Sequence, residues 1–406
     1  MREKEMFVRL SQFFSCRRNW KVKTFCCRFA IPWWSNSLSF FERIRISLPA
    51  RFKNKTMRVE RPISASQKIP SLDGLRTASL ALVLLGHLTG TTYYPTNTVT
   101  RFLGSFAHLG VQIFFVISGF LITTLLLNEQ NRTGRISLSQ FYLRRTVRIF
   151  PAAFTYITVI AVLMRPGYLG YAYTYTMCYA SQHRPWVLGH LWSLSVEEQF
   201  YLLWPVALVL GFAWRRRIGF AVLVLAPLAR LLFWTAGMHE IDEYFPAVAD
   251  CLMMGCLLAM YRPQLRKRAR WMQGPWTFGL LALLMFGSQF LLWRLRSEIF
   301  FGGLVPLSIA AFLFVAVERA DWFLNNRVMN FFGVLSYSLY LWQQPFVNRN
   351  RVDWWTAFPT NLLLTLGLAL VSYFCVEKPF LGLVRHRGAT RSQSTMEHAI
   401  AESTGD

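Results

Sequence analysis

Acidic side chains are scarce in this sequence. Its 406 residues contain 20 Asp and Glu against 44 Lys and Arg, and charged residues of both signs make up only 16% of the chain. Hydrophobic residues make up 54% and gather in long runs. Apolar runs of about 20 residues match the ~30 Å hydrocarbon core of a bilayer. This pattern leaves little room for a soluble fold.

Other absences narrow the class further. The short alternating apolar segments of a transmembrane β-barrel do not occur. The seven cysteines form neither a zinc-binding spacing nor a disulfide framework. No nucleic-acid motif accompanies the net charge of +24. We therefore attribute this charge to basic segments that lie beside anionic lipid headgroups.

The sequence predicts an all-α polytopic integral membrane protein with about ten transmembrane helices. The candidate spans are 74–90, 109–128, 147–164, 191–212, 217–235, 245–261, 275–293, 300–317, 331–347 and 356–376. If the spans alternate, the basic segments 128–148, 215–217 and 262–270 fall on one side, whereas "GMHEIDEY" on the other side has no Lys or Arg. The positive-inside rule then makes both termini cytoplasmic.

The chain divides into three regions. Residues 1–56 form a basic extension that lacks the apolar core of a signal peptide. Two interpretations are open: a disordered or surface-bound extension, or a start of translation at Met57. Residues 57–388 form the membrane domain, and 389–406 form a cytoplasmic tail. Since every candidate functional residue follows Met57, we expect a chain that starts there to insert and act as the full chain does.

Ionisable residues inside membrane spans are costly, so each one is a functional candidate. In the first span His87 follows Arg76 by eleven residues, which places it about 16 Å deeper at ~1.5 Å per residue, near mid-membrane. Arg145 and Arg148 are neighbours on one face of the third span, and guanidinium groups suit phosphate recognition. The alternatives are a histidine that only packs between helices and arginines that only anchor the span.

The fourth span adds acidic residues. In "HLWSLSVEEQFYLLWP", Ser193, Glu197 and Tyr201 share one helical face, and Glu198 points about 100° away. Asp250 is another acid inside a span. The alternatives are a pair of glutamates in water at the outer interface, and an ion pair between Asp250 and an arginine of a neighbouring helix. The predicted layout has arginines at the cytoplasmic mouth, a histidine at mid-depth and carboxylates in the outer half.

Six motifs in order resemble the acyltransferase-3 family of integral membrane acyltransferases, which includes O-antigen and peptidoglycan O-acetyltransferases. They are "LDGLRTASLALVLLGH" at 72–87, "GVQIFFVISGFLIT" at 110–123, "FYLRRTVRIFPA" at 141–152, "HLWSLSVEEQFYLLWP" at 190–205, "LSYSLYLWQQPF" at 335–346 and "VEKPF" at 376–380. The resemblance implies a ten-helix protein of the bacterial cytoplasmic membrane. Such an enzyme passes an acyl group from cytoplasmic acyl-CoA to an acceptor at the outer face.

The resemblance also implies residue roles. Arg76 and His87 match the family's arginine and histidine separated by ten residues. Arg145 and Arg148 match its paired arginines, which would hold CoA phosphates, and Glu197 matches its fourth-span acid.

Two features depart from what some relatives have. Gln343 stands where the family often has a histidine; glutamine can form hydrogen bonds but cannot act as a base. Some relatives also carry a soluble esterase-like domain after the last span, and we expect this chain to be the membrane module alone.

The expected chemistry is transfer of an acyl group, with acetyl as the default, to a hydroxyl of a cell-surface or exported glycan or glycolipid. A neutral His87 would take the proton from the acceptor hydroxyl as it attacks the thioester; a covalent acyl-histidine relay is the alternative. Glu197 would orient the imidazole or bind the sugar. Acetyl-CoA is the expected donor substrate, and no bound cofactor or metal is expected. The remaining polar candidates are expected to support the site or bind substrate: Ser193, Glu198, Tyr201 and Asp250.

Two other function classes compete with this one. A polytopic transporter also carries intramembrane His, Glu and Asp; an inverted internal repeat would favour it, and the sequence shows no obvious one. A lipid-linked glycosyltransferase would need a carboxylate in the first outer loop, and "TGTTYYPTNTVTRFLGSFAHLG" has none.

Overall fold

The computed structural model describes residues 69–180, 183–238, 241–269, 272, 274–295 and 303–383. The basic extension 1–56, the alternative start at Met57 and the tail 389–406 lie outside these residues. Within the described residues the chain is helical and contains no strand. The predicted all-α class is therefore confirmed.

Each of the ten predicted apolar segments overlaps one of the long helices. These helices are α3 (Leu72–Leu88), α5 (Ala107–Thr133), α6 (Leu138–Met164), α9 (Leu191–Val209), α10 (Phe212–Thr235), α11 (Phe245–Arg268), α12 (Pro275–Leu295), α14 (Leu304–Arg319), α16 (Arg327–Trp342) and α17 (Thr360–Ser372). Shorter elements connect them: α4 (Thr98–Gly104), α7 (Leu169–Tyr173), η1 (Met177–Tyr179), α8 (Trp186–Gly189), η2 (Ile241–Glu243), α15 (Trp322–Asn325) and η4 (Tyr373–Glu377).

Five helical stretches in the described part are long and apolar enough to cross a membrane. They are Thr98–Thr133, Leu138–Met164, Ala213–Thr235, Phe245–Arg268 and Thr360–Leu383. The class of a helical, multi-pass membrane protein is thus supported. The count of ten spans and the side of the termini stay predictions.

Several helix boundaries differ from the predicted spans, among them the start of α6 and the end of α16. α6 begins at Leu138 rather than at 147, because the Ser137 side chain caps the helix by accepting from the Gln140 N–H at 3.4 Å. The arginine-rich segment is therefore helical. α16 ends at Trp342 rather than at 347, and a hydrogen-bonded turn follows in which the N–H groups of Phe346 and Val347 both donate to the carbonyl of Gln343.

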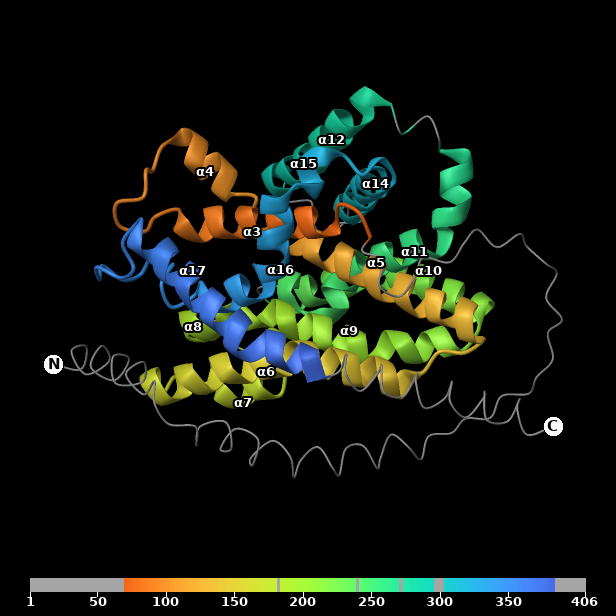
Figure 1. Ribbon diagram of the computed structural model, residues 1–406. Helices are drawn as coiled ribbons and strands as arrows, with labels where there is room; N and C mark the ends of the chain where they lie inside the picture. Colours follow the sequence, from red (N-terminus) through yellow and green to blue (C-terminus); the bar gives the residue numbers. More distant parts are fainter. Residues whose placement is uncertain are drawn as a thin grey trace, which may run out of the picture.

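The long helices form a bundle. In Figure 1, α3 and α5 cross the middle of the molecule, α12 and α14 lie at the top, and α6 and α7 lie at the bottom. The buried core is richest along α5, α9 and α11. α5 and α11 approach closely because a Cβ on Gly119 would lie 1.9 Å from the Leu252 carbonyl oxygen, and one on Gly255 would lie 2.0 Å from that of Val116. Small residues commonly permit such contacts between membrane helices.

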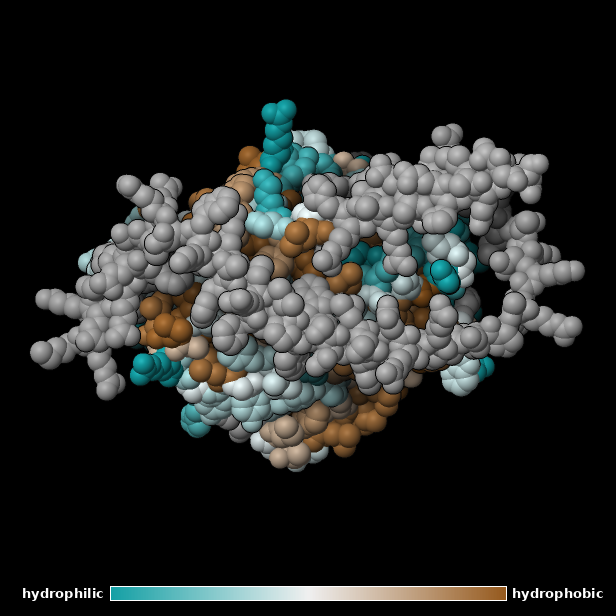
Figure 2. Space-filling view, turned by 60° about the horizontal axis from the view of Figure 1, so that its bottom comes forward, coloured by the Kyte–Doolittle hydropathy of each residue, from teal (hydrophilic) through white to brown (hydrophobic). Residues whose placement is uncertain are grey.

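The outer surface of the bundle is strongly apolar. Figure 2 shows hydrophobic areas beside polar ones where the described residues are visible on the face that lies at the bottom of Figure 1. Many of the exposed residues on the outer helices are large and apolar, among them Val162 of α6, Val224 of α10, Leu283 of α12 and Leu363 of α17. Contiguous exposed apolar surface of this kind marks an interaction with lipid or with other proteins, and a bilayer accounts for it here.

The basic segments gather at one end of the bundle. Arg215, at the start of α10, donates to the Gln130 side chain near the end of α5 at 2.9 Å. Arg216 lies over the ring of Tyr261, near the end of α11, at 5.7 Å. The acidic segment before α11 lies at the other end of these helices. The basic segments thus lie together at one end of the bundle, in the pattern that the positive-inside rule describes.

Candidate active site

The start of α3 is fixed between two other helices. A Cβ on Gly74 would lie 2.1 Å from the carbonyl oxygen of Leu324 in α15, and one on Gly333 of α16 would lie 2.2 Å from the carbonyl oxygen of Asp73. Both positions therefore require glycine. This close packing sets the position of Arg76, whose Nη1 lies 3.4 Å from Oδ1 of Asp73.

Three arginines gather at this end of α3. Arg76 interacts electrostatically with Arg145 and Arg148 of α6. The guanidinium of Arg145 lies 5.4 Å from the ring centre of Tyr201 and 5.8 Å from that of Phe141. Among the described residues, no carboxylate forms an ion pair with Arg145 or Arg148, and the Arg148 side chain is exposed. The predicted phosphate-binding residues thus form one cluster with unused donors.

Two carboxylates of α9 face the arginine cluster. Ser118 of α5 donates to Oε1 of Glu197 at 2.5 Å, and Glu197 interacts electrostatically with all three arginines. The adjacent Glu198 interacts with Arg145, and its buried Oε1 has no hydrogen-bond partner within the described chain. The expected layout, with these acids in the outer half near the histidine, therefore needs correction, because Glu197 belongs to the arginine end of the site.

A further acid, Glu377, lies at the same end. It ends η4, a π-helical turn of a type often found at functional sites. Its carboxylate accepts a hydrogen bond from Ser338 of α16 and interacts electrostatically with Arg148. The sequence motif "VEKPF" contained this residue, but nothing in its local pattern linked it to the third span.

His87 occupies the opposite end of α3, about 16 Å from Arg76 at a rise of ~1.5 Å per residue. Its Nδ1 lies 3.3 Å from Oε1 of Gln343, which follows α16. The edge of its ring meets Trp186 of α8, with the ring centres 5.6 Å apart. Arg349 covers Trp186 at 5.5 Å. The residue that holds the imidazole is thus Gln343, and no hydrogen bond joins His87 to Glu197 in the described structure.

The structure adds His190, which the sequence analysis did not assign. It lies at the start of α9, is 3% exposed, and interacts electrostatically with His87. Its ring packs against Tyr156 and Tyr340, with ring centres 5.4 Å away in both cases. The backbone of Leu341 lies nearby, but neither ring nitrogen meets a described partner at hydrogen-bonding geometry. The sequence feature that could have identified His190 is its place as an ionisable residue at the first position of the fourth-span motif.

The remaining candidates separate into two groups. The hydroxyl of Ser193 lies 2.6 Å from that of Tyr340, which also donates to the backbone carbonyl of His190 at 3.0 Å. Ser193 therefore belongs to the histidine end. Asp250 is 1% exposed and accepts from Nη2 of Arg230 in α10 at 2.9 Å. Its interaction is the structural ion pair that was the alternative for this residue.

The site thus has two ends joined by α3 and α9, which run in opposite directions. One end offers guanidinium groups that suit phosphates. The other offers two imidazoles, which can accept or donate protons. In the described part of the chain, His, Cys, Asp and Glu do not gather in threes of the kind that hold a metal ion.

Comparisons with known proteins identify the class. A family model described as an acyltransferase domain matches residues 69–376. A Staphylococcus aureus (strain COL) protein, named provisionally as an O-acetyltransferase, is 31% identical to this chain over 360 residues. The match covers 77% of this chain and 57% of that protein. O-acetyltransferase OatA of S. aureus (strain NCTC 8325 / PS 47) is 30% identical over 362 residues, with the same two shares.

The chain therefore belongs to the acyltransferase-3 family of membrane acyltransferases. It spans just over half the length of the relatives that it matches. No solved structure matches the chain significantly.

Proposed function

We propose that this protein transfers an acyl group, with acetyl as the default, from acyl-CoA to a hydroxyl of a glycan or glycolipid. The observation that carries the proposal is the separation of two chemical environments along α3. Three arginines surround its first turns, and His87 lies in its last turn. A donor with phosphates at one end and a thioester at the other matches this arrangement.

The binding step uses the arginine cluster. Arg145 and Arg148 have no carboxylate ion pair in the described part of the chain, so their N–H groups are available to the phosphates of CoA. Such charge-assisted hydrogen bonds are stronger than neutral ones. Glu197 and Glu198 offset part of the positive charge of the cluster.

The transfer step uses the histidine end. His87 accepts the proton of the acceptor hydroxyl, whose oxygen attacks the thioester carbon; the C–O bond forms as the C–S bond breaks, and CoA leaves as a thiolate that takes up a proton. The contact between Nδ1 and Gln343 fixes the ring and directs Nε2 to the substrate. His190 lies beside this centre and supplies a second imidazole.

The orientation in the membrane follows the same logic. The arginine end faces the cytoplasm, where acyl-CoA is found, and the histidine end faces outward. We propose ten spans with both termini cytoplasmic, in the cytoplasmic membrane of a bacterium. The gathering of basic segments at one end of the bundle supports this orientation.

The first experiment is release of the CoA thiol from acetyl-CoA by purified protein, with a sugar as acceptor. Wild-type protein should release CoA, and a His87→Ala protein of equal folded yield should not. A transporter, the alternative function, would release none in either form. Mass spectrometry of envelope glycans and lipids with and without the gene would then identify the acceptor from the lost acyl mass.

A further inference from the structure

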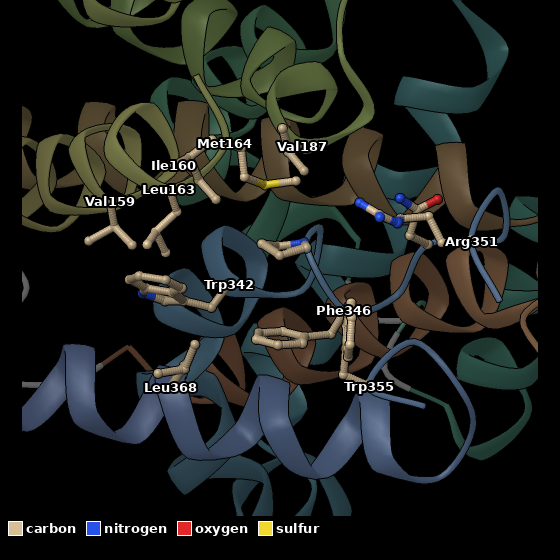
Figure 3. Close-up of a pocket in the computed structure, with 12 residues that line it drawn as sticks. Val159, Ile160, Leu163, Met164, Val187, Trp342, Phe346, Arg351, Trp355 and Leu368 are labelled. Carbon is tan, nitrogen blue, oxygen red and sulfur yellow. The ribbon is translucent and has the colours of Figure 1, made fainter. Parts of the chain in front are cut away.

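A small cavity lies between α6 and α17, beside the histidine end of the site. α6 packs against η4, the turn that follows α17. Further along, α6 and α17 line a cavity of about 50 Å³ together with residues of α8, α16 and the segment after α16. Figure 3 shows Val159 and Leu163 of α6 on one side, Leu368 of α17 on the other, and Trp342 and Phe346 between them.

The surroundings of the cavity are those of lipid-facing helices. Val162 on α6 and Leu363 on α17 are both largely exposed, so both helices present apolar surface to the bilayer next to the cavity. The lining is mostly apolar, with Asn348 and Arg351 as its polar members, and apolar cavities generally stay dry. A hydrocarbon chain that enters from the bilayer between the two helices would fill it.

Trp342 sets a further requirement on the occupant. Its side chain lines the cavity and is only 6% exposed, and its Nε1 has no hydrogen-bond partner in the described structure. In Figure 3 the indole extends into the space between Leu163 of α6 and Leu368 of α17. A buried N–H without an acceptor is unfavourable. A plain hydrocarbon chain offers no acceptor, whereas an ester, ether or glycosidic oxygen at the end of a chain does.

The cavity borders the histidine end of the site. Trp342 precedes Gln343, which holds His87. The ring of Tyr156 contacts both Trp342 and His190, with ring centres 5.2 Å and 5.4 Å away. A molecule whose chain lies in the cavity would therefore carry its polar end toward the two imidazoles.

We propose that the cavity seats the apolar chain of a lipid-borne acceptor. The oxygen that joins chain and head group accepts from the Trp342 N–H, and a head-group hydroxyl reaches His87. The acceptor thus enters sideways from the bilayer, between α6 and α17. This inference rests on the proposed acyl transfer, since it names the class of molecule that receives the acyl group.

The test uses the full chain in vesicles of phosphatidylethanolamine and phosphatidylglycerol. The probe is octyl glucoside with a photoreactive diazirine in its alkyl chain, and cross-linked residues are identified by mass spectrometry. Labelling should concentrate on the cavity residues of α6 and α17. Leu368→Trp fills the cavity and should weaken labelling there about tenfold, whereas Leu363→Trp, on the exposed face of the same helix, should not.

A second measurement addresses the polar contact and the reaction. Trp342→Phe keeps an aromatic ring and removes the N–H, and it should raise the probe concentration needed for half-maximal labelling. In wild-type protein, acyl transfer to octyl glucoside should exceed transfer to glucose, and Leu368→Trp should abolish this preference.

The outcomes separate this inference from the proposed function. Labelling spread evenly over the lipid-facing residues, or unchanged by Leu368→Trp, would mean that bulk lipid alone fills the cavity, and the inference would be wrong. Equal transfer to octyl glucoside and glucose would also overturn it. Labelling requires no turnover. A protein labelled at the cavity but inactive toward acetyl-CoA would therefore contradict the proposed function and leave the chain-binding site standing.

Discussion

Replacing Arg148 by alanine tests the phosphate-binding end of the site most cleanly. The side chain is exposed and forms no ion pair with a carboxylate of the described chain. It interacts with the positive charges of Arg76 and Arg145 and with the carboxylates of Glu197 and Glu377. Its removal therefore costs the unliganded protein no ion pair, and the repulsion and the attraction that are lost act in opposite directions. We expect the thermal stability of the unliganded protein to be little changed.

The effect of Arg148→Ala on stability should appear only when acetyl-CoA binds. A hydrogen bond to a charged group contributes about 1.5–3 kcal/mol, so its loss weakens acetyl-CoA binding roughly ten- to a hundred-fold. At a ligand concentration of about 100 times the wild-type Kd, binding stabilises the wild type by about 2.7 kcal/mol. The same concentration should stabilise Arg148→Ala by only about 0.4–1.4 kcal/mol.

Arg144→Ala is the matched control. Arg144 precedes the pair on the same helix, is also exposed, and pairs with Glu129 at 3.0 Å. Calorimetric titration with acetyl-CoA in detergent gives Kd, and thermal unfolding with and without ligand gives the stabilisation. If Arg144→Ala weakens binding as much as Arg148→Ala does, the effect is one of general surface charge. The assignment of a phosphate site to α6 would then be refuted.

Three further changes test other parts of the structure. His87→Ala should abolish CoA release without lowering acetyl-CoA affinity in a calorimetric titration, and near-normal turnover would place the base elsewhere. His190→Phe keeps a flat ring between the two tyrosines but removes both ring nitrogens, so turnover should fall at least about tenfold and the pH dependence should change; an unaltered rate and pH profile would make His190 a packing residue only. Gly255→Leu should lower thermal stability by at least about 1–3 kcal/mol, while Gly279→Leu, on α12 where a Cβ meets nothing within 4 Å, should not; equal losses would contradict the close packing of α5 and α11.

The helices were readable from the sequence because their signal is local. In lipid every backbone hydrogen bond must be made inside the segment, so a spanning helix shows itself as an apolar run. The predicted helix ends were least accurate where a charged segment or a turn adjoins the apolar run. α6 begins nine residues before its predicted span because its arginine-bearing turns are polar but still helical. The hydropathy of a segment indicates its contact with lipid, whereas the helix itself continues past the residues that contact lipid.

The contacts of the site were not readable, because they join residues far apart in sequence. His87 meets Gln343 across 256 positions, and Ser118 meets Glu197 across 79. The predicted position of Glu197 was also wrong. The sequence analysis placed the acid in the outer half of its span, beyond the arginines and the mid-depth histidine. In the structure His190 takes that position, and Glu197 lies seven residues further along α9, about 10 Å toward the arginines.

In the proposed reaction, the two antiparallel helices fix the relation between donor and base. α3 carries Arg76 and His87 on one rigid element, and α9 repeats the order in reverse, with Glu197 near the arginines and His190 beside His87. A helix cannot change the distance between its two ends without unfolding. Under the proposed function, the phosphates of a bound donor would therefore define where its thioester lies, and buried aromatic side chains pack around His190 at that end of the site. On this geometry the acyl group should be small, which favours acetyl over longer chains.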